Sequence, residues 1–247
     1  MGVSGQRPGA PRGDGVITAL KARRRDSDRL AVYVDGEFCL ELATVVVEEA
    51  GLKPGVLLTA EARDDLLERD APHRARSRSL RLLALRDRSQ YEMESRLQGA
   101  GFDKEVVRDA IGWLKGLGYL DDDRFAARYV AERSEAGYGR RKVRAELRKR
   151  GVARGVIERA LGSASHAAHG ATGELDPLIA VARRRFGSLF VSDPLAAERK
   201  LTGFLARRGY DWEEIGRVIR ILSQGADTIP GTELNGRLDA MDSEPGC

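Results

Sequence analysis

The sequence has few of the residue types that build reactive sites. Its 247 residues include two cysteines, Cys39 and Cys247, and three histidines, His73, His166 and His169. Two cysteines in a chain of this length form no disulfide framework, and neither has the spacing of a metal ligand set. Aromatic residues make up only 6% of the chain. We therefore expect no metal ion and no cofactor.

Long hydrophobic runs are also missing. No run approaches the roughly 18 apolar residues of a membrane-spanning helix. The N-terminus up to Gly15 is rich in Gly, Pro and Arg and lacks the apolar core of a signal peptide. We expect a cytoplasmic protein with no membrane association. The hydrophobic content of 42% is nevertheless enough to bury real cores.

Catalytic motifs are absent as well. The three histidines fall in segments that we expect to be linkers, where a solvated side chain is favoured over a ligand or a base. Gly137-Tyr138-Gly139 resembles the start of a dinucleotide-binding loop, but it follows a predicted helix and lacks the third glycine. The triplet Asp121-Asp122-Asp123 is expected to cap a helix rather than to bind a metal. The sequence therefore predicts that the protein is not an enzyme.

The first part of the chain predicts a small α+β module. Residues 1–14 are expected to be disordered, and residues 15–70 to form three short antiparallel strands followed by helices at 42–50 and 60–69. Asp35-Gly36 lies between two β-prone runs and predicts a tight hairpin, because glycine allows the positive φ that such a turn needs. Thr59 is a predicted N-cap of the second helix.

After Pro72 the pattern becomes helical, and one phrase occurs three times. A leucine is followed four positions later by a glycine, and the glycine is followed directly by an apolar residue. Further apolar residues lie six and ten positions past the glycine. The three copies are Leu97, Gly101, Phe102, Val107, Ile111; Leu147, Gly151, Val152, Ile157, Leu161; and Leu205, Gly209, Tyr210, Ile215, Ile219. A repeated phrase predicts one structural unit copied in tandem, with function on an extended surface.

Each copy predicts a unit of three helices. The first is expected to contain helices at 80–85, 91–97 and 104–114. The phrase glycine is expected to end each middle helix at positive φ, and the following Asp103 and Asp211 to cap the next helix, the latter with Glu214. The fold class is therefore mainly α, with tandem three-helix repeats in an elongated curved stack behind an α+β module with a three-stranded antiparallel sheet. The expected boundaries are 71–124 and 125–161 for two repeats, 162–177 for a flexible joint, 178–224 for the third repeat and 225–247 for a disordered acidic tail.

Charge is distributed unevenly along the chain. The formal net charge is only +4, but residues 128–159 contain 11 Lys and Arg against 4 Asp and Glu. The segment after Gly225 contains five acidic residues and one arginine. Such an asymmetry indicates a partner with negative charge.

The positive charge is concentrated on one predicted helix, in the sequence from Arg140 to Arg150. Val143 and Leu147 define its buried side, and Arg141, Arg144 and Arg148 share another face. The candidate binding residues are Arg140, Arg141, Lys142, Arg144, Arg148 and Lys149. The spacing alone leaves two interpretations open: a solvated face with local Glu partners, or a surface for phosphates or an acidic protein. We expect Tyr119 and Tyr138 to be structural.

Two motifs in order carry a resemblance to a known family. Gly118-Tyr119-Leu120-Asp121-Asp122-Asp123-Arg124-Phe125-Ala126 is followed by the run from Gly137 to Gly151, and together they resemble the central motif of the RecX family, regulators of the RecA recombinase. The resemblance covers about residues 80–222, and the front module resembles an extension found in some members. It implies tandem three-helix repeats and no catalytic activity.

The resemblance also implies a partner. It predicts a monomer that binds RecA or the RecA filament on DNA, in the filament groove, and inhibits RecA ATPase, recombination and SOS-related activity. Contact with single- or double-stranded DNA through phosphates is part of the same expectation. The alternative from another class is a nucleic-acid-binding module that acts through its basic helix without RecA.

Overall fold

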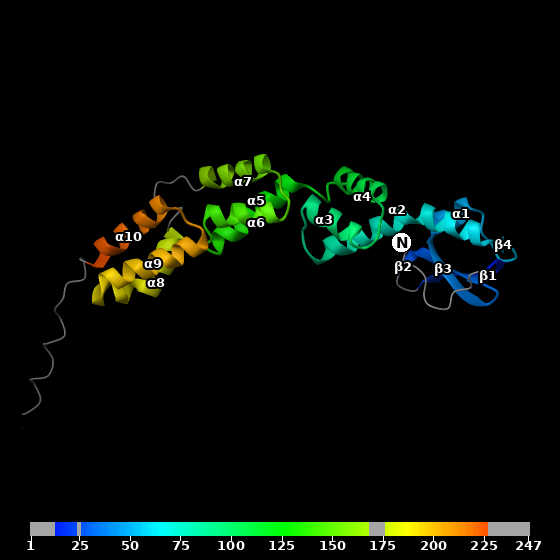
Figure 1. Ribbon diagram of the computed structural model, residues 1–247, viewed down its shortest axis with the longest axis horizontal. Coiled ribbons are helices and arrows are strands. Elements are labelled where there is room, and N and C mark those ends of the chain that lie inside the picture. Colours follow the sequence, from blue (N-terminus) through cyan, green and yellow to red (C-terminus); the bar gives the residue numbers. More distant parts are fainter. Residues whose placement is uncertain (1–12, 24–25, 168–175, 227–247) are drawn as a thin grey trace, which may run out of the picture. The chain divides into compact units, whose positions relative to one another are not determined.

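The computed structural model describes residues 13–23, 26–167 and 176–226 (Figure 1). The strands are β1 (Gly15–Arg23), β2 (Asp26–Val34), β3 (Glu37–Ala43) and β4 (Leu57–Leu58). The helices are α1 (Thr44–Glu49), α2 (Ala60–Leu85), α3 (Gln90–Gln98), α4 (Lys104–Gly116), α5 (Asp122–Glu135), α6 (Arg140–Lys149), α7 (Arg154–Ala167), α8 (Asp176–Ser192), α9 (Pro194–Arg208) and α10 (Trp212–Ala226). The fold is thus mainly helical, with an antiparallel sheet at its start.

The chain divides into two compact units. The first unit runs to Phe125 and includes the short segment Lys149–Ala153. The second unit consists of Ala126–Arg148 and the chain from Arg154 onward.

The sheet of the first unit has the strand order β3-β2-β1-β4. The three predicted strands are confirmed, and both Asp35 and Gly36 have positive φ, at 52° and 85°. The fourth strand was not predicted: Leu57 and Leu58 pair with Val16 and Gly15. A two-residue strand has no alternation pattern of its own, so its existence depends on the chain returning to the free edge of β1.

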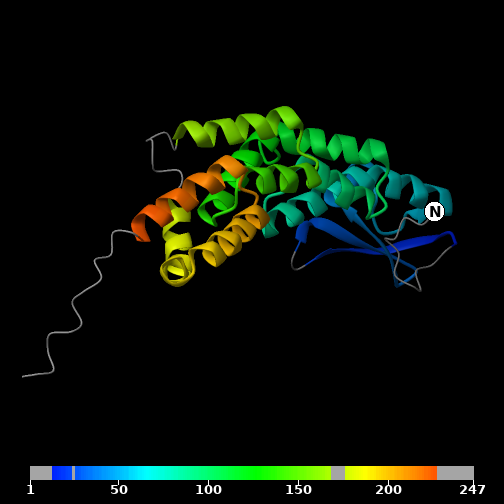
Figure 2. The same ribbon diagram turned by 60° about the vertical axis from the view of Figure 1, so that its left-hand side comes forward.

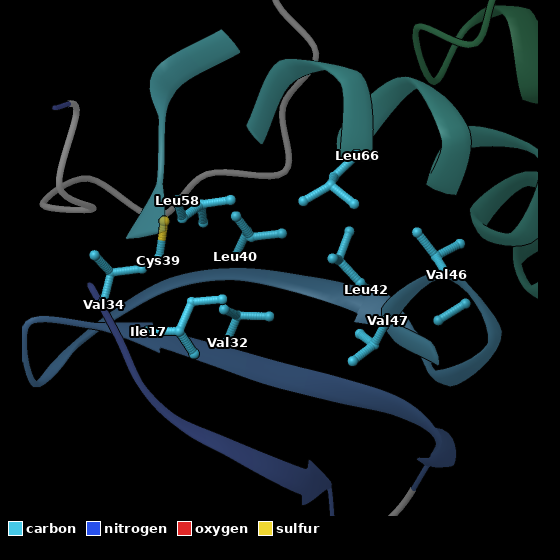
Figure 3. Close-up of a cluster of buried hydrophobic side chains, with 11 residues drawn as sticks. Ile17, Val32, Val34, Cys39, Leu40, Leu42, Val46, Val47, Leu58 and Leu66 are labelled. Carbon is cyan, nitrogen blue, oxygen red and sulfur yellow. The ribbon is translucent and has the colours of Figure 1, made fainter. Parts of the chain in front are cut away.

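Apolar side chains between the sheet and the helices form the core of this module. Figures 2 and 3 show α1 and α2 on one side of the sheet, with the labelled side chains directed into the space between them. Leu42 on β3 and Leu66 on α2 are both almost fully buried. Register shifts interrupt the pairing of β1 with β2 and of β2 with β3. The core therefore joins residues from every element up to the first turns of α2.

Helix α2 corrects two sequence predictions. It is one continuous helix, whereas we expected separate helices at 60–69 and 80–85 and a boundary at 70/71. Pro72 lies inside it, and His73 is therefore in a helix rather than in a linker. The intervening arginines are held by tertiary contacts, because the guanidinium groups of Arg74 and Arg76 lie over the rings of Phe102 and Trp113, at 5.6 and 5.3 Å.

The repeats have the predicted three-helix form, with α3, α6 and α9 as their middle helices. Gly101, Gly151 and Gly209 follow these helices with φ of 86°, 73° and 87°, as predicted for positive-φ ends. We call these three sites the glycine turns. The capping prediction holds for Asp211, which exchanges hydrogen bonds with Glu214. It is wrong for Asp103, whose side chain makes no capping bond although it occupies the N-cap position of α4.

Several helix ends differ from the sequence predictions. Helix α7 continues to Ala167, so the expected joint at 162–177 overlaps its last turns, and position 166 is helical. Helix α5 crosses the expected boundary at 124/125, and α10 reaches Ala226. His169 and the predictions of disorder at 1–12 and 227–247 lie outside the described residues. None of the described helices is long and apolar enough to cross a membrane.

Candidate binding surface on helix α6

Helix α6 is amphipathic and is anchored at its start. Val143 and Leu147 are 1% and 0% exposed, as the four-residue spacing predicts. The N–H of Gly139 donates to the carbonyl of Arg208 at 2.8 Å, and the N–H of Arg141 donates to the carbonyl of Gly209 at 3.1 Å. These two bonds occupy backbone donors that the first turn of a helix would otherwise leave unpaired. The first turn of α6 is thereby attached to the glycine turn after α9.

The same contact explains Gly137-Tyr138-Gly139. A Cβ at position 139 would overlap the backbone of Gly209, and a Cβ at position 209 would overlap the backbone of Lys142. Gly137 has a φ of 72°, which a side chain would strain. The glycines therefore permit close packing of two turns in the second unit.

The first unit contains the corresponding contact one repeat earlier. The hydroxyl of Ser89, the N-cap of α3, donates to the carbonyl of Arg150, and a Cβ on Gly151 would overlap Tyr91. Arg150 pairs with Glu92 at 2.7 Å, and Arg86 pairs with Glu92 at 3.0 Å. Burial would raise the pKa of Glu92, but the hydrogen bond from Arg86 and the charge of Arg150 outweigh it and hold this pKa below its ordinary value.

The predicted cations of α6 have different surroundings. Arg144 forms two hydrogen bonds to the carboxylate of Glu158, at 2.8 and 3.0 Å. The hydrogen bond raises the pKa of Arg144 and lowers that of Glu158. Lys142 Nζ lies 4.5 Å from the centre of the Tyr138 ring, and Arg140 is half-buried. Arg144 therefore has a local Glu partner, which reduces the positive charge that it presents.

Three predicted cations remain free. Arg141, Arg148 and Lys149 are exposed, and their side chains make no hydrogen bond or ion pair with any residue that the structure describes. We call these three residues the α6 cationic surface. Because they lie on one short helix and pair with none of the described carboxylates, they are the part of the predicted face that is open to an anionic partner.

A second group of cations was not predicted as a unit. Arg208 lies over the rings of both Tyr138 and Phe204, at 5.3 and 4.7 Å. Arg185 also lies over Phe204, at 5.1 Å, and Arg133 lies over Tyr138, at 5.2 Å. Together with Lys142 these residues form what we call the cation–aromatic cluster: Arg133, Tyr138, Lys142, Arg185, Phe204 and Arg208. Of its members, Lys142 is one of the candidate binding residues of the sequence analysis.

The two tyrosines that we expected to be structural differ in how far they are exposed. Tyr138 is half-buried within the cation–aromatic cluster, in agreement with the prediction. Tyr119 is 55% exposed, so about half of its side chain lies at the surface.

Two residues of the acidic triplet at the start of α5 accept hydrogen bonds from backbone N–H groups. Asp121 accepts hydrogen bonds from the N–H groups of Asp123 and Arg124, at 2.9 and 3.1 Å, and Asp122 accepts one from Gln90 N–H at 2.8 Å. Burial raises the pKa of Asp122, while the Gln90 bond acts in the opposite direction. Within the described parts of the chain, no group of three or more His, Cys, Asp or Glu could hold a metal ion.

Comparison with known proteins identifies each repeat. Residues 75–114 match the model of the first three-helix domain of RecX, residues 121–161 the second, and residues 174–219 the third. The three matches follow the order of the helices in the chain. They include α6 and both contacts made by the glycine turns.

Whole-chain relatives agree with the domain matches. The regulatory protein RecX of Clostridium acetobutylicum is 28% identical over 84% of this chain and 96% of its own length. That of Xanthomonas campestris pv. campestris is 38% identical over 56% of this chain and 81% of its own. A crystal structure of regulatory protein RecX has a similar fold, with a TM-score of 0.60, 21% identity, and coverage of 83% of this chain and 98% of the other. The chain belongs to the RecX family of regulatory proteins.

Proposed function

We propose that this protein binds RecA, or the RecA filament on DNA, and inhibits its ATPase and recombination activity from the cytoplasm. Membership of a family of regulatory proteins supports a regulatory rather than a catalytic role. The observation that carries the proposal is the α6 cationic surface, because Arg141, Arg148 and Lys149 are exposed and pair with none of the residues that the structure describes. Exposed positive charges on one helix favour fast association with an anionic or acidic partner.

The test measures the DNA-dependent ATPase of RecA with DNA in large excess. Under this condition a protein that merely competes for DNA has no effect, so inhibition reports contact with RecA or with its filament. We expect inhibition by the wild type and its loss in the double variant Arg141→Glu, Arg148→Glu. Arg144 is left unchanged, since a glutamate there would face Glu158 and weaken the fold.

A matched control has the same charge change elsewhere in the second unit. Arg217 and Arg220 on α10 are exposed and make no hydrogen bond or ion pair with the described residues. The variant Arg217→Glu, Arg220→Glu should inhibit like the wild type. Full inhibition by a folded Arg141→Glu, Arg148→Glu variant would sink the assignment of the α6 cationic surface.

The second candidate function is nucleic-acid binding without RecA. The basic run around α6 favours it, because residues 128–159 contain 11 Lys and Arg against 4 Asp and Glu. This function predicts that the inhibition disappears as DNA is raised to excess. The same titration therefore separates the two candidates.

A further inference from the structure

The cation–aromatic cluster concentrates four cations around two rings. Arg133, Lys142 and Arg208 all lie within 5.3 Å of the centre of the Tyr138 ring. Arg208 and Arg185 both lie within 5.1 Å of the centre of the Phe204 ring. The rings attract each cation, but they do not remove the repulsion between the cations.

Counter-ions for this cluster are scarce. Arg133 pairs with Glu146 at 3.0 Å. Arg208 donates to the carbonyls of Ala136 and Gly137, both at 3.1 Å, which are not charged. Lys142 and Arg185 make no side-chain hydrogen bond or ion pair within the described parts of the chain. A guanidinium that is stacked on a ring still presents its N–H edge, so the cluster can bind carboxylates or phosphates.

The chain carries an anionic segment directly after helix α10. Residues 227–247 contain Asp227, Glu233, Asp239, Asp242 and Glu244 against the single Arg237. They follow α10, which packs against α8 and α9, the helices that bear Arg185 and Arg208. A chain of this length extends up to about 70 Å, whereas the 17-residue helix α8 is about 25 Å long. The acidic segment is therefore long enough to contact the helices that bear Arg185 and Arg208.

We propose that the acidic segment 227–247 binds the cation–aromatic cluster and supplies the missing counter-ions. Its carboxylates pair with Lys142 and Arg185, which have no carboxylate partner among the residues that the structure describes. The segment is then an internal competitor for any external polyanion that approaches this surface. The inference concerns the chain alone and does not depend on an interaction with RecA.

The last residue of the chain provides the probe. Cys247 is a thiol at the end of the acidic segment, while Cys39 is 1% exposed and burial raises its pKa, which keeps it protonated and unreactive. The variant Arg184→Cys places a second thiol on α8 beside Arg185 without removing a member of the cluster. The matched control, Arg217→Cys, places one on α10, close in sequence to the acidic segment. Both positions are exposed arginines.

Disulfide formation under mild oxidation is measured by peptide mass spectrometry on the full chain at low ionic strength. We expect the bond to Cys247 to form about tenfold faster in Arg184→Cys than in Arg217→Cys, because several charge pairs hold the segment at the cluster. Salt at about 0.5 M should remove this excess. The excess should also disappear in a background in which the five acids of the segment are changed to amides. This background alters none of the residues that the structure describes.

Two results would overturn the proposal. Equal rates at the two positions would show that the segment does not dwell at the cluster. An excess at position 184 that survives neutralisation of the five acids would show that the contact is not electrostatic. Neither result bears on RecA inhibition, so the two proposals fail separately.

Discussion

Single residues in the glycine turns share one backbone conformation but have different neighbours. Gly101 has a φ of 86° with open space where a Cβ would lie, whereas Gly209 has a φ of 87° and lies against the backbone of Lys142. We expect Gly101→Ala to cost about 1–2 kcal/mol from the left-handed conformation alone. Gly209→Ala should cost about 1–3 kcal/mol more, because the two turns must separate. Urea unfolding followed by far-UV circular dichroism measures both losses.

Gly101→Ala is a matched control for Gly209→Ala, since both variants introduce the same methyl group at the same place in the repeated phrase. Equal losses would contradict the inference that the turn after α9 anchors α6. A further check is amide exchange at Arg141, whose N–H donates to the carbonyl of Gly209. Its exchange should accelerate in Gly209→Ala and remain unchanged in Gly101→Ala.

Glu92 gives the first unit a stability that depends on pH. Its pKa in the folded state lies below the ordinary value of 4.5, and its carboxylate accepts from both Arg86 and Arg150. A lowered folded pKa contributes stability that is present above pH 4.5 and is lost as the pH falls through the folded value. We expect the melting temperature of the wild type to fall more steeply below pH 4.5 than that of Glu92→Gln. Parallel pH profiles would contradict this role.

At the scale of elements, local patterns were predictable and tertiary ones were not. The hairpin at Asp35-Gly36 and the three glycine turns depend on positive φ at one or two residues, which the sequence reveals directly. The continuity of α2 was missed because the segment around Pro72 has no apolar periodicity. That part of the helix is held instead by Arg74 and Arg76 stacked on rings that are distant in sequence.

Helix α2 also carries Asp70, which forms a buried ion pair with Arg29 on β2. Asp70 is 0% exposed and accepts from Arg29 at 2.8 Å and from the N–H of Ala43 at 2.8 Å. Asp70→Ala should destabilise the protein by about 3 kcal/mol, since it leaves the N–H of Ala43 without its acceptor and Arg29 with Glu41 as its remaining carboxylate partner. Asp65→Ala, on the same helix but exposed, should change stability by less than about 1 kcal/mol. The urea midpoints of the two variants measure these losses. Similar losses would contradict the inference that Asp70 holds the sheet against α2.

At the scale of the molecule, the candidate site was only half predictable. The cations of α6 are contiguous in sequence, so their concentration was visible, although the partner of Arg144 was not. The cation–aromatic cluster draws on α5, α6, α8 and α9, and its members are brought together by the contact of Gly139 with Arg208 and Gly209. No pattern within one segment could reveal it, because the contact depends on packing between repeats.

The uneven charge along the chain predicts where a polyanion binds. Residues 128–159 contain 11 Lys and Arg against 4 Asp and Glu, whereas residues 15–43, which include the strands β1–β3, contain five of each kind. Heparin added to the full chain at low ionic strength should therefore slow amide exchange in α6, α8 and α9 and leave the strands β1–β3 unchanged. Salt at about 0.5 M should abolish the protection. Hydrogen-exchange mass spectrometry measures the protection, and equal protection of the strands would contradict binding at these basic helices.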